Sequence, residues 1–517
     1  MKNPKLLQMV AITALLAAPF FDARAEVGDE SAIKITVDWR QTIGTSKTTA
    51  SVAMVAYPLM RQGSPIAAAA WNSLEELNAK YVRYVTWFPY PRLAVAELEA
   101  PTAEKTSWDF SLIDPEMIKF LETTRGREPI VNFSVIPAWM LKTEKPAAYP
   151  DNPDQASWDN NPYMTSDLVD RSGKQLSDYY ARIVSWYTQG GFTDENGKYH
   201  RSGYHYEIPW WGVLNEVQAE YQTTPQEYVK RYDTIVAAIR KVSPKTKFVG
   251  LALAPMGRLS GSLKPTPEPE FFQYFLDPKN HQPGISLDMM SYHFYATPSA
   301  SQTLDSWQYS FFDQADGFLA NVALVESIRK RLAPSTRVNL DELGILLADD
   351  WRSAKYERDI IPEPYWNLYG AFYAYLYLEL AKIGIDVATL SEFLNYPGNQ
   401  RSCSLLNWKT GKPLASLRIL KLIRDNFGPG DKLAATSYTD LPVPEVEAQA
   451  FATAKGRKLL VINKRMVAER IDVTAVGHIA TIDVVDVGSG DGPPRRENPN
   501  GPVVHLEPFA VAVLSLN

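Results

Sequence analysis

Ile208-Pro-Trp-Trp-Gly-Val-Leu-Asn215-Glu216 is the stretch that best indicates the fold of this chain. Seven mostly apolar residues lead into a polar Asn-Glu pair, and a more polar segment follows from Val217. A nearly continuous apolar run of this length is typical of a parallel strand that is buried on both faces. In α/β barrels the carboxyl ends of such strands carry the reactive side chains. We therefore expect Glu216 at the carboxyl end of a barrel strand.

A second stretch with the same pattern is Thr336-Arg-Val-Asn-Leu-Asp341-Glu342-Leu-Gly344. We expect a strand over residues 337–341 that ends at Glu342. Two strands that each end in Glu bring together the two carboxyl groups that cleavage of a glycosidic bond requires. One protonated carboxyl group donates to the leaving oxygen, and one ionised carboxylate attacks the anomeric carbon. The sequence thus predicts that Glu216 and Glu342 act as a pair.

The chain around these two stretches alternates between strand-like and helix-like segments from residue 51 to residue 427. Eight such units predict a (β/α)8 TIM barrel, an α/β fold, because no glycine-rich phosphate loop of an open sheet follows the first strand. The expected strands are 51–57, 81–87, 129–136, 208–214, 247–253, 287–292, 337–341 and 386–390, and the expected helices include 112–123, 174–188, 225–242, 318–332 and 365–383. Long loops at 142–167 and 348–364 indicate functional segments, although loops also tolerate insertions without a function.

From residue 432 to residue 517, short β-prone runs replace this alternation. The runs are 446–452, 458–462, 470–474, 479–487 and 503–516, with an exposed loop expected at Gly488-Ser-Gly-Asp-Gly. They predict a C-terminal antiparallel β-sandwich domain. Residues 26–50 contain Ile33-Lys-Ile35-Thr-Val37, whose alternation is that of a half-buried strand. This N-terminal strand segment is a candidate further strand of the sandwich.

Residues 1–25 have the pattern of a secretory signal peptide. Lys2 and Lys5 precede an apolar run from residue 6 to residue 21, and Ala23-Arg24-Ala25 matches a cleavage site. A membrane anchor is the weaker interpretation, because the run is short and ends in small residues. We expect cleavage after Ala25, a secreted or periplasmic protein, and no membrane partner after cleavage.

Composition excludes several classes of partner. The formal charge is -6 and no basic residues cluster, so a nucleic-acid partner is disfavoured. The single Cys403 cannot form an intramolecular disulfide, and we interpret it as a small packed hydrophobe. Stability must come from a buried core, which a chain of this length can supply. No His/Cys/Asp cluster has the spacing of metal ligands, so we expect no catalytic metal and no cofactor.

Beyond these patterns, the sequence resembles the clan A retaining glycoside hydrolases, and most of all glycoside hydrolase family 39. The resemblance covers nearly the whole chain after residue 25 and rests on Asn215-Glu216, Glu342, Trp108-Asp-Phe-Ser-Leu-Ile-Asp114, Pro129-Ile-Val-Asn-Phe-Ser-Val-Ile-Pro137, Leu406-Asn-Trp-Lys-Thr-Gly-Lys-Pro413 and the C-terminal β runs. It implies that Glu216 is the acid/base, that Glu342 is the nucleophile and that Arg83 lies near Glu342. It also implies that Ser291-Tyr-His293-Phe-Tyr295 lines the site. Where the family's xylosidases carry His-Gly shortly after this Arg, this chain has Val85-Thr86-Trp87.

The candidate substrate-binding residues are therefore Asn215, Arg83, His293, Tyr295, Trp87, Trp139 and Glu392. Several have plain structural alternatives. Arg83 could be a paired barrel arginine, and His293 a core histidine. Trp87 and Trp139, like Trp211, could stack on sugar rings or pack in the core. Glu392 follows the eighth strand and could bind a sugar hydroxyl or take the role assigned to Glu342.

These features together predict a retaining glycoside hydrolase that cleaves β-glycosidic bonds in a polysaccharide or oligosaccharide by double displacement. Its partner would be a carbohydrate substrate. Two alternatives remain open: a transglycosylase that uses the same carboxylates, and a carbohydrate-binding barrel without catalysis.

Overall fold

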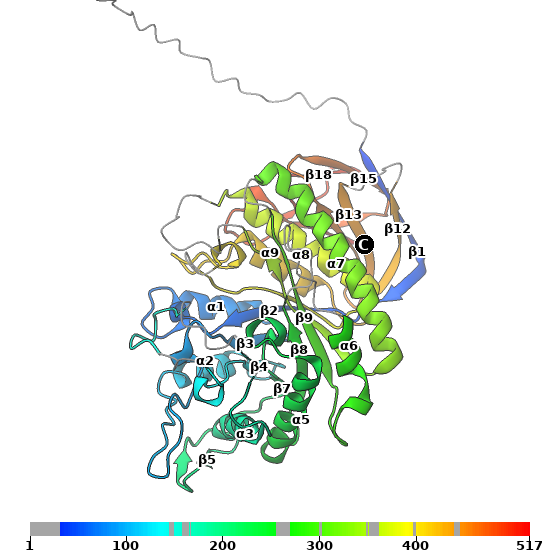
Figure 1. Ribbon diagram of the computed structural model, residues 1–517. Coiled ribbons are helices and arrows are strands. Elements are labelled where there is room, and N and C mark those ends of the chain that lie inside the picture. The colour runs from blue at the N-terminus through cyan, green and yellow to red at the C-terminus, as the bar shows by residue number, and fades with distance from the viewer. Residues whose placement is uncertain are drawn as a thin grey trace, which may run out of the picture.

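The computed structural model describes residues 32–143, 149–157, 165, 167–254, 269–298, 302–347, 350, 361–395, 400–438 and 445–517. The predicted signal peptide lies outside these residues. So do parts of both predicted long loops, namely residues 144–148, 158–164, 166, 348–349 and 351–360. Figure 1 shows a barrel with its helices and a β-rich domain beside it.

The barrel is a closed sheet of eight strands in the order β10-β11-β2-β3-β4-β7-β8-β9. Every neighbouring pair runs parallel. In chain order the strands are β2 (Thr49–Val55), β3 (Val82–Thr86), β4 (Ile130–Phe133), β7 (Trp210–Gly212), β8 (Lys247–Leu253), β9 (Met289–Ala296), β10 (Arg337–Ile345) and β11 (Val387–Leu390). A helix follows each strand, so the predicted TIM barrel is confirmed.

The helices are α1 (Ala67–Leu77), α2 (Asp114–Thr123), α3 (Lys174–Thr188), α4 (Val217–Glu220), α5 (Pro225–Val242), α6 (Pro269–Leu276), α7 (Leu304–Leu332), α8 (Pro364–Ile383) and α9 (Ala415–Asn426). Short 3₁₀ turns are η1 (Pro58–Met60), η2 (Pro91–Leu93), η3 (Ala138–Met140), η4 (Pro278–Asn280), η7 (Arg401–Cys403) and η8 (Val487–Ser489). A two-stranded hairpin, β5 (Gly191–Thr193) and β6 (Tyr199–Arg201), follows α3. Helix α5 begins where predicted, because Pro225 opens it and Thr224 and Glu227 form a capping box.

Three predicted boundaries in the barrel are wrong in an informative way. Strand β7 is shorter than residues 208–214, because the backbone leaves the sheet after Gly212. Strand β10 continues to Ile345, so Glu342 lies within the strand rather than after its end. Helix α7 begins at Leu304 instead of residue 318 and is the longest helix in Figure 1.

The β-rich domain is a nine-stranded sheet in the order β17-β16-β19-β14-β13-β12-β1-β15-β18. Its strands are β1 (Ile33–Thr45), β12 (Lys432–Tyr438), β13 (Val446–Thr453), β14 (Gly456–Asn463), β15 (Glu469–Ala475), β16 (Ile479–Val485), β17 (Arg495–Glu497), β18 (Val503–Leu506) and β19 (Val511–Leu516). Strand β1 lies between β12, with which it is antiparallel, and β15, with which it is parallel. The pairing is thus not purely antiparallel as expected. The run 503–516 forms two strands rather than one, and the run 479–487 stops at Val485.

The two faces of this sheet are buried against different partners. One face forms a local core in which Ile471 of β15 and Leu506 of β18 join Leu459 and Leu514 of β14 and β19, so the sheet folds over on itself. On the other face Phe451 belongs to the large core that also contains the barrel and its helices. The centroid of its ring lies 4.6 Å from the ring centroid of Phe427, the residue just after α9. The barrel and the β-rich domain therefore share one continuous core.

At the amino ends of the barrel strands, a separate cluster closes the interior. It consists of Tyr81, Ile130, Trp210, Val249, Met289 and Val387, all of them buried. These side chains come from or adjoin six different barrel strands and fill the lumen as a packed layer. The polar side chains described below occupy the opposite, carboxyl end.

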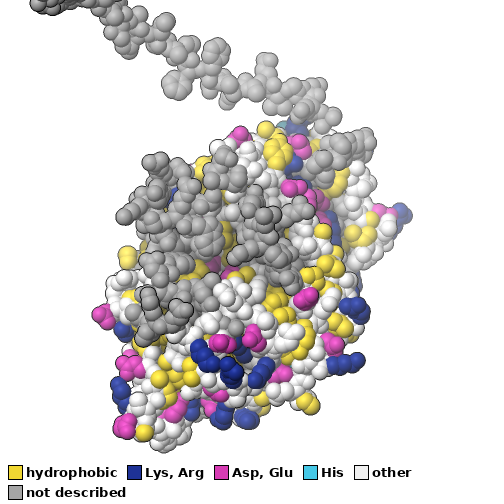
Figure 2. Space-filling model, viewed as in Figure 1, with side chains coloured by type: hydrophobic (Ala, Val, Ile, Leu, Met, Phe, Trp, Pro, Cys, Tyr) yellow, Lys and Arg dark blue, Asp and Glu magenta, His cyan; other side chains and the backbone are white. Residues whose placement is uncertain are grey.

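The molecular surface carries charges of both signs. On the face shown in Figure 2, Lys and Arg side chains are interspersed with Asp and Glu side chains. Within the described part of the chain, no helix combines the length and apolar character that crossing a bilayer requires.

The shared core predicts that the barrel does not fold without the β-rich domain. A chain that ends at Phe427 leaves β1 without both of its neighbours and exposes apolar faces of α8 and α9. We expect this shortened chain to aggregate, as measured by size-exclusion chromatography and thermal unfolding. A soluble monomer with the melting temperature of the full chain would contradict this.

A point substitution tests the same interface more gently. Phe451→Ala should lower the free energy of unfolding by about 3–5 kcal/mol, because it leaves a cavity in the shared core. Val467→Ala, at a residue of the same domain that is 58% exposed, is the control and should change it by less than about 0.5 kcal/mol.

Candidate active site

The end of β7 is shaped by close packing against β4. A Cβ atom on Gly212 would lie 2.8 Å from Cγ of Asn132, so a larger residue would displace that side chain. The Asn132 amide is needed where it is, because its Nδ2 donates to the carbonyl oxygen of Leu214 (3.0 Å). Gly212 in the Trp-Trp-Gly-Val segment therefore lets β4 support the turn that carries Asn215 and Glu216.

This turn has a strained backbone. Leu214 has φ 65° and Glu216 has φ 40°, values that non-glycine residues rarely adopt. Strand β8 holds the turn in place, since the backbone N–H groups of Val213 and Glu216 donate to the carbonyl oxygens of Val249 (2.9 Å) and Ala252 (2.8 Å). Strained residues that the surrounding structure holds in place are typical of functional sites.

Glu342 owes its position to an irregularity in β10. Asn339 pairs with Ser291 of β9, yet Glu342 pairs with His293, so β10 contains one extra residue. A bulge of this kind interrupts the alternation of side chains along a strand. Asp341 and Glu342 are adjacent in sequence, but both side chains reach the same guanidinium group of Arg83.

Arg83, on β3, is the centre of a polar cluster that also contains Asp341, Glu342 and Asn215. Only 1% of its surface is exposed. Its Nε lies 3.2 Å from Oδ2 of Asp341, and its Nη1 donates to Oε1 of Glu342 (2.5 Å). Its Nη2 donates to Oδ1 of Asn215 (2.6 Å). Burial opposes the charge, but the carboxylates of Asp341 and Glu342 outweigh burial and raise the pKa of Arg83. Arg83 thus links the turn after β7 to the bulge in β10.

The other oxygen of Glu342 faces two side chains of β9. The hydroxyl of Tyr295 donates to Oε2 of Glu342 (2.9 Å) and is also within 2.7 Å of Oγ of Ser391. Nδ1 of His293 lies 3.4 Å from the same Oε2. Glu342 is therefore surrounded by groups that can donate hydrogen bonds to an ionised carboxylate.

His293 is fully buried and lies between both glutamates. Its Nδ1 is 3.0 Å from Oε1 of Glu216, and its Nε2 is 3.3 Å from Oδ1 of Asp341. Burial lowers the pKa of His293, but the carboxylates of Glu342 and Asp341 outweigh burial and raise it to about 10. An imidazolium at this position can donate toward the carboxylates on either side. His293 thus contacts Glu216, Glu342 and Asp341 within one buried polar cluster.

One oxygen of Glu216, one oxygen of Glu342 and a nitrogen of His293 all lie within 4.8 Å of one another. Three side chains of these types could bind a cation. Their spacing in the sequence does not indicate such a site, because they come from three different strands and loops. A histidine must be neutral to coordinate a metal, whereas the surrounding carboxylates favour the imidazolium of His293. Nδ1 of His293 lies within 3.4 Å of an oxygen of each glutamate, so it can exchange a proton with either.

Glu392 follows β11, the barrel strand next to β10, which carries Glu342. It is 5% exposed, and its Oε2 accepts a hydrogen bond from the hydroxyl of Tyr57 (3.2 Å). Burial, and after it the charge of Glu342, raises the pKa of Glu392 to about 8. A carboxyl group that keeps its proton at neutral pH is a poor nucleophile, so this geometry favours Glu342 over Glu392 for that role.

The three candidate stacking tryptophans have different environments. Trp87 is half-buried after β3, and its Nε1 donates to Oε1 of Glu220 (3.1 Å). Trp139, on η3, is half-buried and donates to the carbonyl oxygen of Glu97 (2.9 Å). Trp211 is 1% exposed and stacks on Phe133 in the core, so the stacking role considered for it is wrong. On the short strand β7, Trp211 points outward to the helices while Trp210 fills the lumen.

Sequence reasoning missed four residues of this cluster: Tyr57, Glu220, Asp341 and Ser391. Asp341 was visible as an acidic neighbour of Glu342, but regular strand alternation would have put it on the opposite face. Tyr57 and Ser391 had a weaker signal, because each adjoins the carboxyl end of a predicted strand. Glu220 follows Glu216 by four residues, a spacing that keeps two side chains near each other on a helix.

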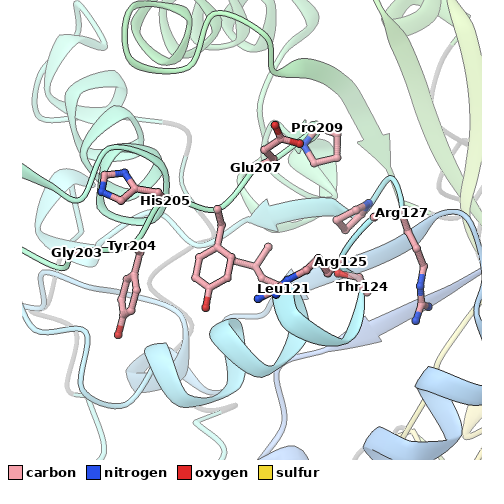
Figure 3. Close-up of a pocket in the computed structure, with 12 residues that line it drawn as sticks. Leu121, Thr124, Arg125, Arg127, Gly203, Tyr204, His205, Glu207 and Pro209 are labelled. Carbon is pink, nitrogen blue, oxygen red and sulfur yellow. The ribbon is translucent and has the colours of Figure 1, made fainter.

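A pocket of about 590 Å³ lies at the amino ends of β4 and β7, away from this cluster. Its lining includes Arg125, Arg127, Tyr204, His205 and Glu207. In Figure 3 the side chains of His205, Glu207 and Arg127 point in different directions rather than toward a common centre. This pocket does not gather groups for catalysis.

No protein-family model matches the sequence, and no curated protein is significantly similar to it. Solved structures are similar in fold. A GH51 arabinofuranosidase from Xanthomonas axonopodis pv. citri has a TM-score of 0.60 at 12% identity, over 94% of this chain and 100% of that one. A glucosidase from Croceicoccus marinus has a TM-score of 0.55 at 14% identity, over 94% and 99%. A GH30 endoxylanase from Clostridium papyrosolvens C71 has a TM-score of 0.52 at 12% identity, over 94% and 100%. At this identity the similarity establishes the shared fold.

The buried acid Glu392 predicts a pH-dependent stability. Its pKa is about 8 in the folded protein, against an ordinary value of 4.5, so between these pH values the folded state binds more protons than the unfolded state. Stability should therefore fall with rising pH in this window, by up to about 1.4 kcal/mol per pH unit from this group. Glu392→Gln should remove that contribution, measured by urea unfolding from pH 5 to pH 8.

The control is Glu76→Gln, which changes an exposed carboxyl group on α1. It should keep the pH dependence of the unmodified protein. If Glu392→Gln also keeps it, Glu392 is ionised in the folded state and the argument against it as nucleophile no longer holds.

Proposed function

We propose that this protein is a retaining glycoside hydrolase that acts by double displacement. The observation that carries the proposal is the approach of Glu216 to Glu342, with one carboxyl oxygen of each within 4.8 Å of the other. Retaining enzymes hold their two carboxyl groups about 5–5.5 Å apart, whereas inverting enzymes need about 6.5–9.5 Å to admit a water molecule.

The different surroundings of the two glutamates support their roles. The Glu342 side chain is 10% exposed and accepts hydrogen bonds from Arg83 and Tyr295, which suits a fixed nucleophile. The Glu216 side chain is 22% exposed, and its hydrogen bond to a side chain is with His293. A more open carboxyl group can reach the leaving oxygen and, later, a water molecule.

In the first step an oxygen of Glu342 attacks the anomeric carbon, and Glu216 gives its proton to the departing glycosidic oxygen. A covalent glycosyl ester on Glu342 results, and Glu216 is left as a carboxylate. In the second step Glu216 takes a proton from water, the resulting hydroxide attacks the anomeric carbon, and the bond to Glu342 breaks. Hydrogen bonds from Arg83 and Tyr295 stabilise the negative charge that Glu342 regains when this bond breaks.

We also propose a clan and family, a substrate class and a cellular location for this protein. The position of Asn215-Glu216 after the fourth barrel strand and of Glu342 on the seventh supports membership of clan A, and the sequence resemblance supports family 39. We propose β-glycosidic bonds of a polysaccharide or oligosaccharide as the substrate class. The pattern of residues 1–25 supports export from the cytoplasm.

A covalent intermediate is the first prediction of this mechanism. Aryl glycosides of xylose, glucose and α-L-arabinofuranose form the first substrate panel, because similar solved structures are described as an endoxylanase, a glucosidase and arabinofuranosidases. The 2-deoxy-2-fluoro form of the best substrate should trap the enzyme, and peptide mapping should find the label on Glu342. A label on Glu392 would overturn the assignment of the nucleophile.

The products distinguish this function from its alternatives. Proton NMR should first detect the same anomer as in the substrate. Mass analysis of products from polysaccharides should detect shortened chains, whereas elongated chains would indicate a transglycosylase. No turnover of any substrate, combined with sugar binding, would indicate a barrel that binds carbohydrate without catalysis.

The acid/base role of Glu216 makes a separate prediction. Glu216→Gln should lower kcat about 10²–10⁴-fold on substrates with poor leaving groups, because general acid catalysis contributes about that much. On aryl glycosides with good leaving groups, the alkaline limb of the kcat/KM profile should disappear. An alkaline limb that survives this substitution would mean that another group is the acid.

A further inference from the structure

Glu220 is a further buried carboxyl group beside the two proposed catalytic glutamates, and the mechanism above does not use it. It is the last residue of the short helix α4 and is 5% exposed. Its backbone N–H donates to the carbonyl oxygen of Glu216 (2.7 Å), so the two residues belong to one turn. The inference that follows rests on the proposed function and asks what Glu220 contributes to it.

The contacts of Arg83 fix the orientation of Asn215. An arginine has only donor groups, so the atom of Asn215 that faces Nη2 of Arg83 must be the carbonyl oxygen Oδ1. The amide nitrogen Nδ2 then faces Oε1 of Glu220 at 3.2 Å. Asn215 therefore joins Arg83 to Glu220, and its two ends cannot be exchanged without placing donor against donor.

The contacts of Glu220 also determine where it can carry a proton. Oε1 accepts from two donors, Nε1 of Trp87 (3.1 Å) and Nδ2 of Asn215 (3.2 Å). Neither donor can accept a hydrogen bond in return, so a proton on Glu220 must be on Oε2. Oε2 is buried and has no hydrogen-bond partner within the described part of the chain.

We propose that Glu220 is a positioning residue, held as a neutral carboxylic acid, that fixes Asn215 and Trp87 beside Glu216. One of its two carboxyl oxygens, Oε1, accepts hydrogen bonds from both the Asn215 amide and the Trp87 indole. The half-buried indole of Trp87 is then held as one wall of the sugar-binding mouth, and the amide of Asn215 keeps its orientation toward Arg83.

Electrostatics agrees with a neutral Glu220. Burial, reinforced by the nearby carboxylate of Glu216, raises the pKa of Glu220 well above its usual range. Glu216 becomes a carboxylate after it donates its proton, and a second negative charge one helical turn away would oppose that step. A neutral Glu220 supplies an acceptor for the two donors without adding this repulsion.

Two substitutions separate positioning from mere support of the fold. Glu220→Ala leaves the donors of Trp87 and Asn215 without Oε1 and should lower kcat/KM about tenfold to 100-fold. Glu220→Gln keeps a neutral group with an acceptor oxygen and should recover kcat/KM to within about threefold of the unmodified enzyme. Both are assayed on the best aryl glycoside of the panel, together with thermal unfolding.

The pH profile tests whether Glu220 is neutral in the working range. If Glu220 were ionised in the working range, Glu220→Gln would remove a charge that helps Glu216 keep its proton, and the alkaline limb of kcat/KM would move to lower pH. We expect the limb to stay where it is. A shift of more than about half a pH unit would overturn the neutral state.

A double substitution tests the tie to Trp87 directly. The effects of Glu220→Ala and Trp87→Phe should be clearly less than additive, because both remove the same hydrogen bond. Additive effects would show that Glu220 does not position the indole. If Glu220→Ala proves too unstable to assay, the Glu220→Gln profile still tests the neutral state of Glu220.

Glu116→Gln is the matched control, since Glu116 is also a buried carboxyl group but lies on helix α2. It should leave the alkaline limb unchanged and should show additive effects with Trp87→Phe. An unmodified enzyme that cleaves none of the panel would count against the proposed function. An active enzyme in which Glu220→Ala has full activity would count against the role of Glu220 alone.

Discussion

The buried guanidinium group of Arg83 is the constraint on which the proposed site depends. A charge with 1% exposure is stable in a protein interior only when it is fully paired, and Arg83 meets Asp341, Glu342 and Asn215. Loss of one partner from such a network commonly costs about 3–5 kcal/mol, so each partner also has a structural role. Because the partners come from β10 and from the turn after β7, Arg83 sets the distance between the two halves of the site. This pairing holds Asn215, the residue before Glu216, next to the guanidinium group that also binds Glu342.

The surroundings of His293, Glu220 and Glu392 shift the pKa values of these three side chains. His293 is surrounded by carboxylates, and their charge favours its imidazolium form. Glu220 lies one turn after Glu216, Glu392 follows the strand next to that of Glu342, and burial favours the neutral forms of both. Burial thus gives Glu220 and Glu392 a chemistry that differs from that of an ordinary glutamate, which is how environment separates roles among carboxyl groups. Two neutral acids beside the pair also limit repulsion when Glu216 and Glu342 carry charge.

The β-rich domain supports the barrel from outside rather than contributing to the polar cluster. Its sheet covers α8 and α9, and residues such as Phe451 and Leu460 belong to the same core as the barrel. Strand β1 completes the sheet, although it precedes the barrel in the chain. The first and last described strands, β1 and β19, are therefore in the same sheet, and the barrel is formed by the chain between them. Such an arrangement stabilises the scaffold on which the strained turn at Glu216 depends.

The sequence by itself determined the barrel, its order of strands and helices, and the two stretches that carry Glu216 and Glu342. Apolar runs that end in polar residues are local patterns, and they are legible because buried parallel strands need them. Only the tertiary structure decided which polar residues meet. The bulge in β10 puts Asp341 beside Glu342, and no periodicity in the sequence reveals an extra residue in a strand. The contacts of His293 and Glu220 join residues from different strands and loops. Whether such residues come within hydrogen-bonding distance depends on how the closed barrel brings the strand ends together.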